Sequence, residues 1–338
     1  MTPAQMLEGI LGNETTRRRR SVAKAITLLE SVRTDHRMQA DELLTRLVPH
    51  AGKSFRIGIS GVPGVGKSTF IEALGLWLIA RGHQVAILAV DPSSTVSGGS
   101  ILGDKTRMEQ LSVHPNAYIR PSPSRGSLGG VAEKTRESIL ICEAAGYDIV
   151  IVETVGVGQS ETAVANMTDM FCLLQLPNAG DDLQAIKKGV MEIADLVVIN
   201  KADTDPQAAT RAEAQISGAL HLLSSIGNSR EPTSRWVPQV IKTSALTKQG
   251  IDVFWSSVMS FQREQSEAGL IERRRRAQAL DWMWERIHAE LKRSFQDDPA
   301  IRALLPAISA QVEGGVIPAS TGARKLIAAH AEARRMVS

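Results

Sequence analysis

The spacing of apolar residues changes twice along the chain and divides it into three parts. Over residues 1–50 the apolar positions recur every three or four residues, as in Val22, Ile26, Leu29 and Val32 and again in Leu43, Leu44, Leu47 and Val48. This period is that of an amphipathic helix, so it predicts an N-terminal helical extension over residues 1–50.

Residues 51–265 carry short apolar runs that alternate with helical stretches. The runs predict strands at 55–60, 84–90, 147–152, 170–176, 196–200 and 240–243. The stretches predict helices at 68–80, 131–146, 183–194, 205–226 and 249–264. This alternation is typical of an α/β fold, a mainly parallel sheet covered by helices on both faces. The chemistry of such a sheet gathers at the carboxyl ends of its strands.

The strand pattern ends near residue 265, and residues 266–338 predict a C-terminal helical arm. An apolar stripe runs through residues 267–296 and comprises Leu280, Met283, Trp284, Ile287 and Leu291. The arm is too short to build a large core of its own. We therefore expect the stripe to be buried against the main domain or a second subunit, and a homodimer arm with Trp282 and Trp284 as packing anchors is the preferred interpretation.

Composition predicts a soluble globular protein. Of the 338 residues, 43% are hydrophobic and 22% are charged, with a net charge of +3. That balance and an aromatic content of 4% do not indicate nucleic acid as a partner. No apolar run approaches the ~20 residues of a membrane span. The N-terminal segment, with Glu8 and Glu14, does not resemble a signal or transit peptide, so we expect a cytoplasmic protein with no membrane partner.

The arginine run and the two cysteines have ordinary structural interpretations. Arg17–Arg20 reads as a solvated helix face, with an acidic partner surface as the alternative. Cys142 and Cys172 each lie in an apolar run, which predicts buried, reduced thiols.

A glycine-rich motif follows the first predicted strand and opens a predicted helix. It consists of Gly61, Val62, Pro63, Gly64, Val65, Gly66, Lys67, Ser68 and Thr69. Glycines let backbone N–H groups turn toward a phosphate, and the helix amino terminus adds positive potential. Lys67 would reach the β- and γ-phosphates, and Ser68 would hold Mg²⁺. With its strand and helix flanks, the motif is a strong prediction of a P-loop.

A second motif, Asn200, Lys201 and Asp203, follows a later strand. The Asp203 carboxylate can accept hydrogen bonds from N1–H and the exocyclic amine of guanine, which adenine does not offer in that arrangement. Such charged hydrogen bonds contribute about 1.5–3 kcal/mol each. The segment Ser244, Ala245 and Leu246, after the last predicted strand, is the expected partner loop that offers backbone N–H to guanine O6. We therefore predict binding of GTP and GDP.

Three acidic residues lie where an oxygen-loving Mg²⁺ would need ligands besides Ser68, namely Asp91, Asp104 and Glu153. Asp91 and Glu153 end predicted strands, and Asp104 lies in a glycine-rich loop. Carboxylates at strand ends also cap helices or begin turns, which remains the alternative for each. The expected catalytic set is Lys67, Asp104, Glu153 and Gly156.

Two further segments have the character of switch loops. Gly156 follows the strand end at Glu153 and would sense the γ-phosphate through its N–H. Asp181, Asp182, Gln184, Lys187 and Lys188 form the other segment, for which a helix cap with solvated lysines is the alternative. No glutamine follows Gly156 and no arginine is an obvious finger, so we expect low intrinsic hydrolysis that a partner raises.

Together these motifs resemble one family of GTPases. The matching segments are 61–69, 91–94, 99–108, 120–126, 153–161 and 178–184 through 200–203. The chain is similar to MeaB, the methylmalonyl-CoA mutase-associated GTPase, whose human relative is the methylmalonic aciduria type A protein and whose older name was ArgK, a transport-linked kinase. The resemblance is dense over about residues 20–265 and looser over the terminal helices.

The resemblance implies a metallochaperone-type GTPase that serves an adenosylcobalamin-dependent methylmalonyl-CoA mutase, gates cofactor loading and protects or reactivates the mutase. It implies Ser68, Asp91, Asp104 and Glu153 as the Mg²⁺ set, the segment 183–188 as a third switch, a homodimer formed by the C-terminal arm, and an adenosyltransferase as a further partner. Alternatives are a nickel-inserting GTPase, an ATP-using kinase of amino-acid transport, and a scaffold that hardly hydrolyses GTP. The seven scattered histidines disfavour the first, and Asp203 the second.

Overall fold

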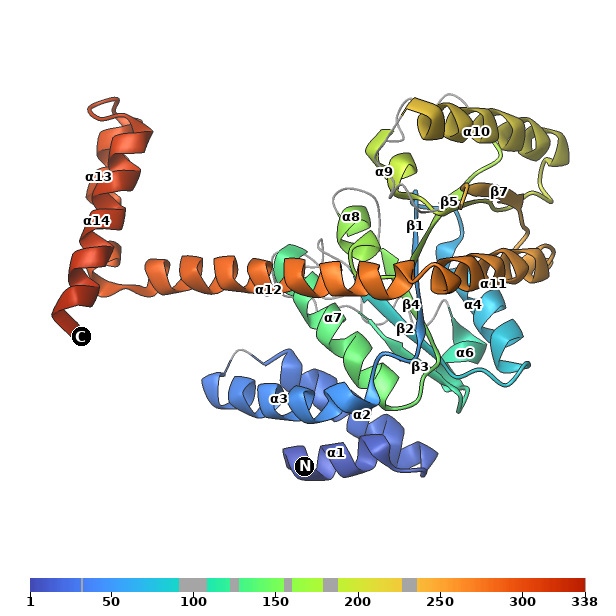
Figure 1. The fold of residues 1–338 in the computed structure, drawn as a ribbon, viewed down its shortest axis with the longest axis horizontal. Helices are drawn as coiled ribbons and strands as arrows, with labels where there is room; N and C mark the ends of the chain where they lie inside the picture. Colours follow the sequence, from blue (N-terminus) through green and yellow to red (C-terminus); the bar gives the residue numbers. More distant parts are fainter. Residues whose placement is uncertain are drawn as a thin grey trace. The chain divides into compact units, whose positions relative to one another are not determined.

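The computed structural model describes residues 1–31, 33–90, 108–121, 128–154, 160–178, 188–226 and 236–337. Several predicted site residues lie outside these ranges, namely Asp91, Asp104, Gly156, Asp181, Asp182, Gln184 and Lys187. The chain forms two compact units, Met1–Arg275 and Arg276–Ser338. The first contains the sheet and the N-terminal helices, and the second contains most of the C-terminal helices (Figure 1).

Within the described residues, seven strands form one sheet in the order β3-β2-β4-β1-β5-β6-β7. The strands are β1 (Phe55–Gly61), β2 (Val85–Val90), β3 (Ala117–Arg120), β4 (Ile149–Thr154), β5 (Met170–Gln175), β6 (Leu196–Ile199) and β7 (Gln239–Lys242). Every neighbouring pair is parallel, which confirms the α/β prediction. The six predicted strands are all present, and β3 is an edge strand that the sequence analysis missed.

The strand order places β1 in the middle of the sheet. From β1 the chain builds β2, β3 and β4 on one side and then β5, β6 and β7 on the other. A ligand site in a parallel sheet lies where the strand order reverses in this way, outside the carboxyl ends of the strands. The segments that follow β1, β4, β6 and β7 include the P-loop, Gly156, Asn200 and Ser244.

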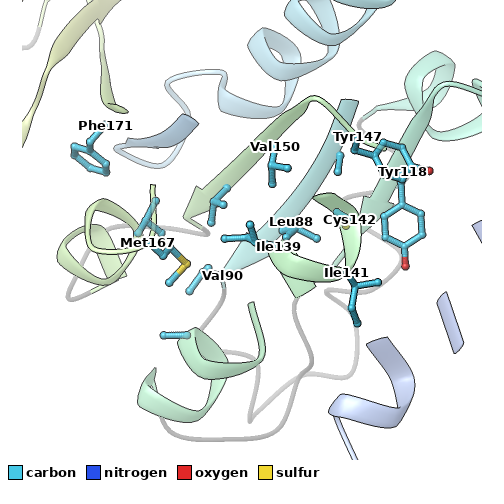
Figure 2. Close-up of a cluster of buried hydrophobic side chains, with 14 of the residues drawn as sticks. Leu88, Val90, Tyr118, Ile139, Ile141, Cys142, Tyr147, Val150, Met167 and Phe171 are labelled. Atoms are coloured by element: carbon cyan, nitrogen blue, oxygen red, sulfur yellow. The ribbon is translucent and has the colours of Figure 1, made fainter. Parts of the chain in front are cut away.

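Helices cover both faces of the sheet, as predicted. One face packs against α4 (Lys67–Ile79), α6 (Glu109–Val113) and α11 (Ile251–Glu267). The other packs against α7 (Leu128–Ala144), α8 (Ser160–Ala165), α9 (Lys188–Ile193) and α10 (Pro206–Ile226). Figure 2 shows part of this second core, where Leu88 and Val150 of the sheet lie among side chains that include Ile139 and Cys142 of α7.

The N-terminal helices belong to this second core. They are α1 (Pro3–Leu11), α2 (Thr15–Leu29), α3 (Thr34–Leu47) and the short 3₁₀ helix η1 (Val48–His50). The predicted stripe is buried at Val22, Ile26 and Leu29, but Val48 is exposed because the α-helix has ended before it.

The arginine run is only partly the solvated face that we predicted. Arg18 donates to the Gln84 side chain, and Arg19 donates to the backbone carbonyls of His114 and Ser112. Arg17 and Arg20 are exposed. Half of the run therefore ties α2 to the loops at the amino ends of β2 and β3.

Buried charges hold the amino ends of the central strands. The Asp169 carboxylate, which precedes β5, accepts from the Arg56 backbone N–H at 2.8 Å and from Arg275 Nε and Nη2 at 2.7 and 2.6 Å. Arg275 also donates to the carbonyls of Gly52 and Ser54. The hydrogen bonds and charge of Asp169 raise the pKa of Arg275 although burial opposes this.

A second buried pair lies beside the first. Glu143, with a side chain only 1% exposed, receives Arg56 Nε and Nη2 at 2.8 and 3.0 Å and the Ser54 hydroxyl at 2.6 Å. Burial alone would raise the pKa of Glu143, but the hydrogen bonds and charge of Arg56, with those from Ser54 and Gly52, lower it. The carboxylate is therefore ionised in the folded protein at neutral pH.

The second unit contains the rest of α12 (Leu270–Asp297) with α13 (Pro299–Glu313) and α14 (Ala319–Val337). α13 and α14 pack on each other, and Asp298 joins them because it caps α13 at Ala300 N and lies 2.5 Å from His330 Nδ1 of α14. The predicted stripe of α12 is exposed, with Leu280 at 58% and Trp284 at 56%. None of the described helices is apolar over a length that would span a bilayer.

We predict that Glu143→Gln lowers the free energy of unfolding by about 3 kcal/mol at pH 7, because it leaves the half-buried Arg56 without its counter-charge. The pKa of Glu143 is lowered in the folded state, so its ionised form stabilises the protein above its ordinary value of 4.5, and this contribution is lost as pH falls through the lower folded pKa. The difference in free energy of unfolding between variant and wild type should therefore become smaller as the pH falls below 4.5 and through the lower folded pKa of Glu143. Urea unfolding at several pH values measures it.

The control is Glu42→Gln on α3, where an exposed carboxylate faces Arg46 at 3.8 Å. It should change stability by no more than about 0.5 kcal/mol. If the difference in free energy of unfolding between Glu143→Gln and wild type did not change with pH, the shape of the Glu143 side chain, and not its charge, would be what stabilises the fold.

Candidate functional site

The glycine-rich motif forms the turn between β1 and α4. Gly61, the last residue of β1, has φ 155°, and a Cβ there would lie 2.6 Å from the Leu174 carbonyl oxygen of β5. Lys67 starts α4, and its ammonium folds back to donate to the Gly61 carbonyl at 2.6 Å and to Val62 at 3.4 Å. The backbone of the turn is thus closed around the Lys67 ammonium.

The turn delivers the amino terminus of α4 to the carboxyl edge of the sheet. Gly66 is its N-cap residue in the left-handed conformation at φ 93°, without a side-chain cap. The first N–H groups of α4, among them that of the half-buried Ser68, are therefore available to an anion. Beyond this turn the helix is buried through Phe70, Ile71 and Leu74.

The Asn200 side chain connects this turn to the segment after β7. Its Nδ2 donates to the Val65 carbonyl at 2.8 Å, and its Oδ1 accepts from Ala245 N at 3.1 Å and from Thr243 Oγ1 at 3.3 Å. Asn200 is 1% exposed. A Cβ on Gly66 would come within 2.8 Å of its Nδ2, so the amide also requires glycine at the start of α4. The two predicted motifs are therefore parts of one site.

The side chains beside Asn200 point to solvent. Lys201 takes the left-handed conformation at φ 59°, and both Lys201 and Asp203 are exposed. Leu246 is 80% exposed, which is unusual for a large apolar residue in a tight turn. The exposed side chains of Lys201, Asp203 and Leu246 are therefore accessible to a ligand.

The segment after β7 is a tight turn. Ser244 N donates to the Gln249 carbonyl, and Ser244 Oγ accepts from Thr247 N. Gly250 closes the turn at φ 77°, where a Cβ would lie 2.4 Å from the Lys242 carbonyl oxygen. Of the backbone N–H groups that the segment Ser244–Leu246 was expected to offer to guanine O6, that of Ala245 already donates to Asn200 Oδ1 at 3.1 Å.

A hollow of about 290 Å³ lies beside Asp203, between the first turn of α10 and the turn after β7. Pro206, Ala209 and Thr210 line one wall, and Lys242, Ser244 and Gln249 line another. Residues 61–69 of the P-loop are not among the residues that line it.

Glu153, one of the residues predicted to bind Mg²⁺, is the penultimate residue of β4. It lies on the same face of β4 as Ile149 and Ile151, which is the face covered by α4, and it is 3% exposed. The register sets it beside Ile59 of β1 and Ala89 of β2. On the other face, Thr154 and Ser60 share a 2.9 Å hydrogen bond between their hydroxyls.

The donor set fits Mg²⁺ better than a transition metal. Ser68 and Glu153 supply a hydroxyl and a carboxylate, and Mg²⁺ prefers oxygen ligands, often one or two carboxylates plus phosphates. No group of three or more His, Cys, Asp or Glu residues able to hold a metal occurs among the residues described. Both cysteines are free and buried, which confirms the prediction of buried, reduced thiols, and burial raises the pKa of each.

Sequence reasoning missed the side-chain partners that assemble the site. The spacing of Asn200 and Lys201 gave no sign that the Asn200 amide binds Val65 and Ala245, which are far away in the sequence. The Ser60–Thr154 pair and Gln175, which is buried at the end of β5, were also missed. Only a strand order would have shown that these residues are neighbours. Of the second switch segment, Lys188 begins α9.

Comparison with known proteins identifies the family. Residues 22–300 match the model of the family described as methylmalonyl Co-A mutase-associated GTPase MeaB. The chain belongs to the MeaB family. It is 46% identical over 322 residues to the mitochondrial methylmalonic aciduria type A homolog of Mus musculus, which covers 92% of this chain and 76% of that protein.

Other MeaB relatives agree with this assignment. The GTPase ArgK of Escherichia coli (strain K12) is 46% identical over 310 residues, with 91% of this chain and 92% of that protein covered. A crystal structure described as a LAO/AO transport system kinase superposes with a TM-score of 0.74 at 36% identity and covers 96% of each chain. The MeaB-family chain is therefore a P-loop GTPase in sequence and in fold.

Proposed function

We propose that this chain binds GTP and Mg²⁺ at the carboxyl edge of its sheet, hydrolyses GTP to GDP and phosphate, and uses the nucleotide state to control a mutase partner. The observation that carries the proposal is the Asn200 side chain, which joins the phosphate loop at Val65 to the base loop at Ala245. One buried amide thus sets the distance between the place for the phosphates and the place for the base.

The P-loop supplies the groups that hold the triphosphate. The amino terminus of α4, which has no side-chain cap, would direct its first N–H groups at the phosphates, and Lys67, which contacts the carbonyls of Gly61 and Val62, has its ammonium inside the same turn. Ser68 and Glu153 would hold Mg²⁺ with Asp91 and Asp104. When bound, Mg²⁺ neutralises the charge that develops on the β- and γ-phosphate oxygens. Catalysis of this kind depends on placement, which a rigid turn provides.

The base loop supplies the selectivity for guanine. Asp203 is exposed next to Lys201 and can accept two hydrogen bonds from the base, while Lys201 and Leu246 can cover its flat faces. With no glutamine after Gly156, the residues that would orient water are not evident, and a low intrinsic rate raised by the partner follows. The guanine selectivity expected of Asp203 distinguishes this proposal from the alternative of an ATP-using kinase.

We predict that Asp203→Asn lowers the affinity for GTP by at least about tenfold, because two charged hydrogen bonds are lost. Xanthosine triphosphate should gain affinity, since the amide can donate to the oxygen that replaces the exocyclic amine. Competition against a fluorescent guanine nucleotide measures both.

The matched control is Asp205→Asn. Asp205 lies two residues further on and caps α10 at Ala208 N, and asparagine caps a helix about as well as aspartate. Its nucleotide preference should be that of the wild type. An Asp203→Asn protein that keeps its GTP affinity and gains nothing for xanthosine would overturn the assignment of the base.

The proposed partner is argued from the family description and from the strands that the switch segments follow in the chain. The family description names methylmalonyl-CoA mutase. Gly156 and residues 181–188 follow β4 and β5, the two strands that flank β1 and its P-loop. We infer that these segments carry the nucleotide state to an adenosylcobalamin-dependent methylmalonyl-CoA mutase, so that GTP hydrolysis gates cofactor loading and protects or reactivates the enzyme. An adenosyltransferase that supplies the cofactor is the further partner expected.

We predict that the affinity for purified methylmalonyl-CoA mutase differs by about fivefold or more between the GDP state and a non-hydrolysable GTP analogue. Calorimetric titration of the full chain with mutase in each state measures it, and Asp203→Asn with guanine nucleotides serves as the control that should lose the difference. Binding that is equal in both states would contradict the switch. Phosphate release that does not rise with mutase would favour a scaffold.

We propose that a second copy of the chain covers the exposed stripe of α12. Leu280, Met283, Trp284, Ile287 and Leu291 are all exposed, and their spacing places them on one face of the helix. A continuous apolar face of this kind indicates an interface, and the family resemblance implies a homodimer.

We predict that Leu280→Glu combined with Trp284→Glu converts a dimer into a monomer, because two carboxylates would be buried without partners. Light scattering after gel filtration measures the molecular mass of the wild type and of the double variant. Ala289→Glu, on the opposite face of α12 and also exposed, is the control that should stay dimeric. A wild-type mass of one chain would refute the homodimer.

A further inference from the structure

The hydroxyl groups of Ser60 and Thr154 join two neighbouring strands at the carboxyl edge of the sheet. Ser60 lies on β1 directly before Gly61, and Thr154 lies on β4 directly after Glu153. The two hydroxyl oxygens are 2.9 Å apart, and both residues are fully buried. This contact, the hydroxyl bridge, therefore links the residue that precedes the P-loop to the residue that follows a proposed metal ligand.

The hydroxyl bridge lies just beyond the point where the register pairs of β1 and β4 end. The last such pair is Ile59 with Glu153. At the next residue each strand is paired with its other neighbour, because Thr154 pairs with β2 and Ser60 pairs with β5. The bridge therefore extends the connection between β1 and β4 by one residue, to the position from which the P-loop starts.

The hydroxyl bridge and the Glu153 carboxylate lie on opposite faces of the sheet. Side chains alternate along a strand, so Thr154 shares the face of Val152, and Glu153 shares that of Ile151. On the face of the bridge, α8 packs against both β1 and β4. The bridge is therefore too far from a metal ion bound by Glu153 to contact it, and it can act on that ion only by fixing the backbone from which Glu153 projects.

The start of the P-loop is also fixed from the other side of β1. A Cβ on Gly61 would lie 2.6 Å from the Leu174 carbonyl oxygen of β5, so the backbone there packs directly on β5. Ser60 is paired with β5 and bonded to Thr154 of β4. The lateral position of this part of β1 is thus set by close packing on one side and by the hydroxyl bridge on the other.

We infer that Ser60 and Thr154 are positioning residues of the nucleotide site, whose hydroxyl bridge sets the spacing between the P-loop and the Glu153 carboxylate. The inference rests on the proposed function, in which Glu153 and Ser68 of the P-loop hold Mg²⁺. Binding of Mg²⁺ requires near-ideal octahedral geometry, so its affinity is sensitive to the spacing of the ligands. Groups that orient metal ligands without touching the metal influence metal binding strongly.

The test compares Thr154→Val with Thr154→Ser in the full chain. Valine keeps the shape of the side chain and removes the hydroxyl, whereas serine keeps the hydroxyl and removes a methyl group. For Thr154→Val we expect the Mg²⁺ concentration at half-maximal single-turnover GTP hydrolysis to rise by about fivefold, the effect of one lost hydrogen bond. The gain in affinity for fluorescent GDP on adding Mg²⁺ should shrink by a similar factor, while the affinity in EDTA stays at the wild-type value. Thr154→Ser should remain close to wild type in each measurement.

A double variant separates positioning from general stability. Ser60→Ala alone leaves the Thr154 hydroxyl buried without this partner, so the urea midpoint of unfolding should fall. Ser60→Ala combined with Thr154→Val replaces both hydroxyls by apolar groups, which can be nearly neutral for stability. We therefore expect the double variant to regain much of the urea midpoint and to keep the raised Mg²⁺ requirement of Thr154→Val. Thr135→Val, which removes a buried hydroxyl that donates to the Val131 carbonyl within α7, is the control that should leave the Mg²⁺ requirement unchanged.

Two results would overturn the inference. One is a Thr154→Val protein whose Mg²⁺ requirement equals that of wild type. The other is a Mg²⁺ requirement that follows the urea midpoint and recovers in the double variant, which would mean that the two hydroxyls only stabilise the fold. A wild-type protein that neither binds nor hydrolyses GTP would instead refute the proposed function, so the two failures are distinguishable.

Discussion

A single buried amide determines how the carboxyl edge of this sheet is built. Asn200 donates to the Val65 carbonyl in the phosphate turn and accepts from Ala245 N and Thr243 Oγ1 in the turn after β7. An unpaired polar group in that buried position would cost about 1–3 kcal/mol, so the three contacts are strongly coupled. The glycine at Gly66 follows from the same constraint, since a Cβ there would collide with the amide. Phosphate turn and base turn cannot move apart independently.

The amino edge of the sheet is held by ion pairs, in contrast to the neutral Asn200 amide at the carboxyl edge. Asp169 precedes β5 and Asp195 precedes β6, and each accepts from an arginine at the start of α12, Arg275 and Arg274 respectively. Asp195 also accepts from Phe171 N, which binds the two strand starts to each other. For the more deeply buried pair, Arg275 with Asp169, removal of Arg275 would cost about 3–5 kcal/mol because the Asp169 charge would be left buried and unpaired. These contacts fix the amino ends of β5 and β6, and the proposed site residues lie after their carboxyl ends.

Much of this arrangement could be predicted from the sequence, and the rest has physical reasons for being hidden. The six apolar strands and the P-loop follow from patterns that are local in the chain. β3 (Ala117–Arg120) was missed because it is four residues long, lies at an edge and buries only its first two residues well. Arg18 and Arg19 were read as solvated because charge runs usually are, yet their partners Gln84 and His114 lie on loops distant in sequence. The Glu72 carboxylate of α4 was missed for the same reason, because it accepts hydrogen bonds from Gln110 N and Leu111 N of α6, which are distant from it in the sequence.

The first residues of α12, which lie in the first unit, contact the amino ends of two strands whose carboxyl ends lead into the proposed nucleotide site. α12 begins with Leu270 and Ile271 buried in the first unit, and Arg274 and Arg275 then neutralise the carboxylates in front of β5 and β6. The same two strands end at Gln175 and Ile199, directly before the second switch segment and Asn200. Both strands are fully buried, and they are only six and four residues long. The helix that carries the exposed stripe is therefore continuous with residues that fix the strands of the base and switch loops.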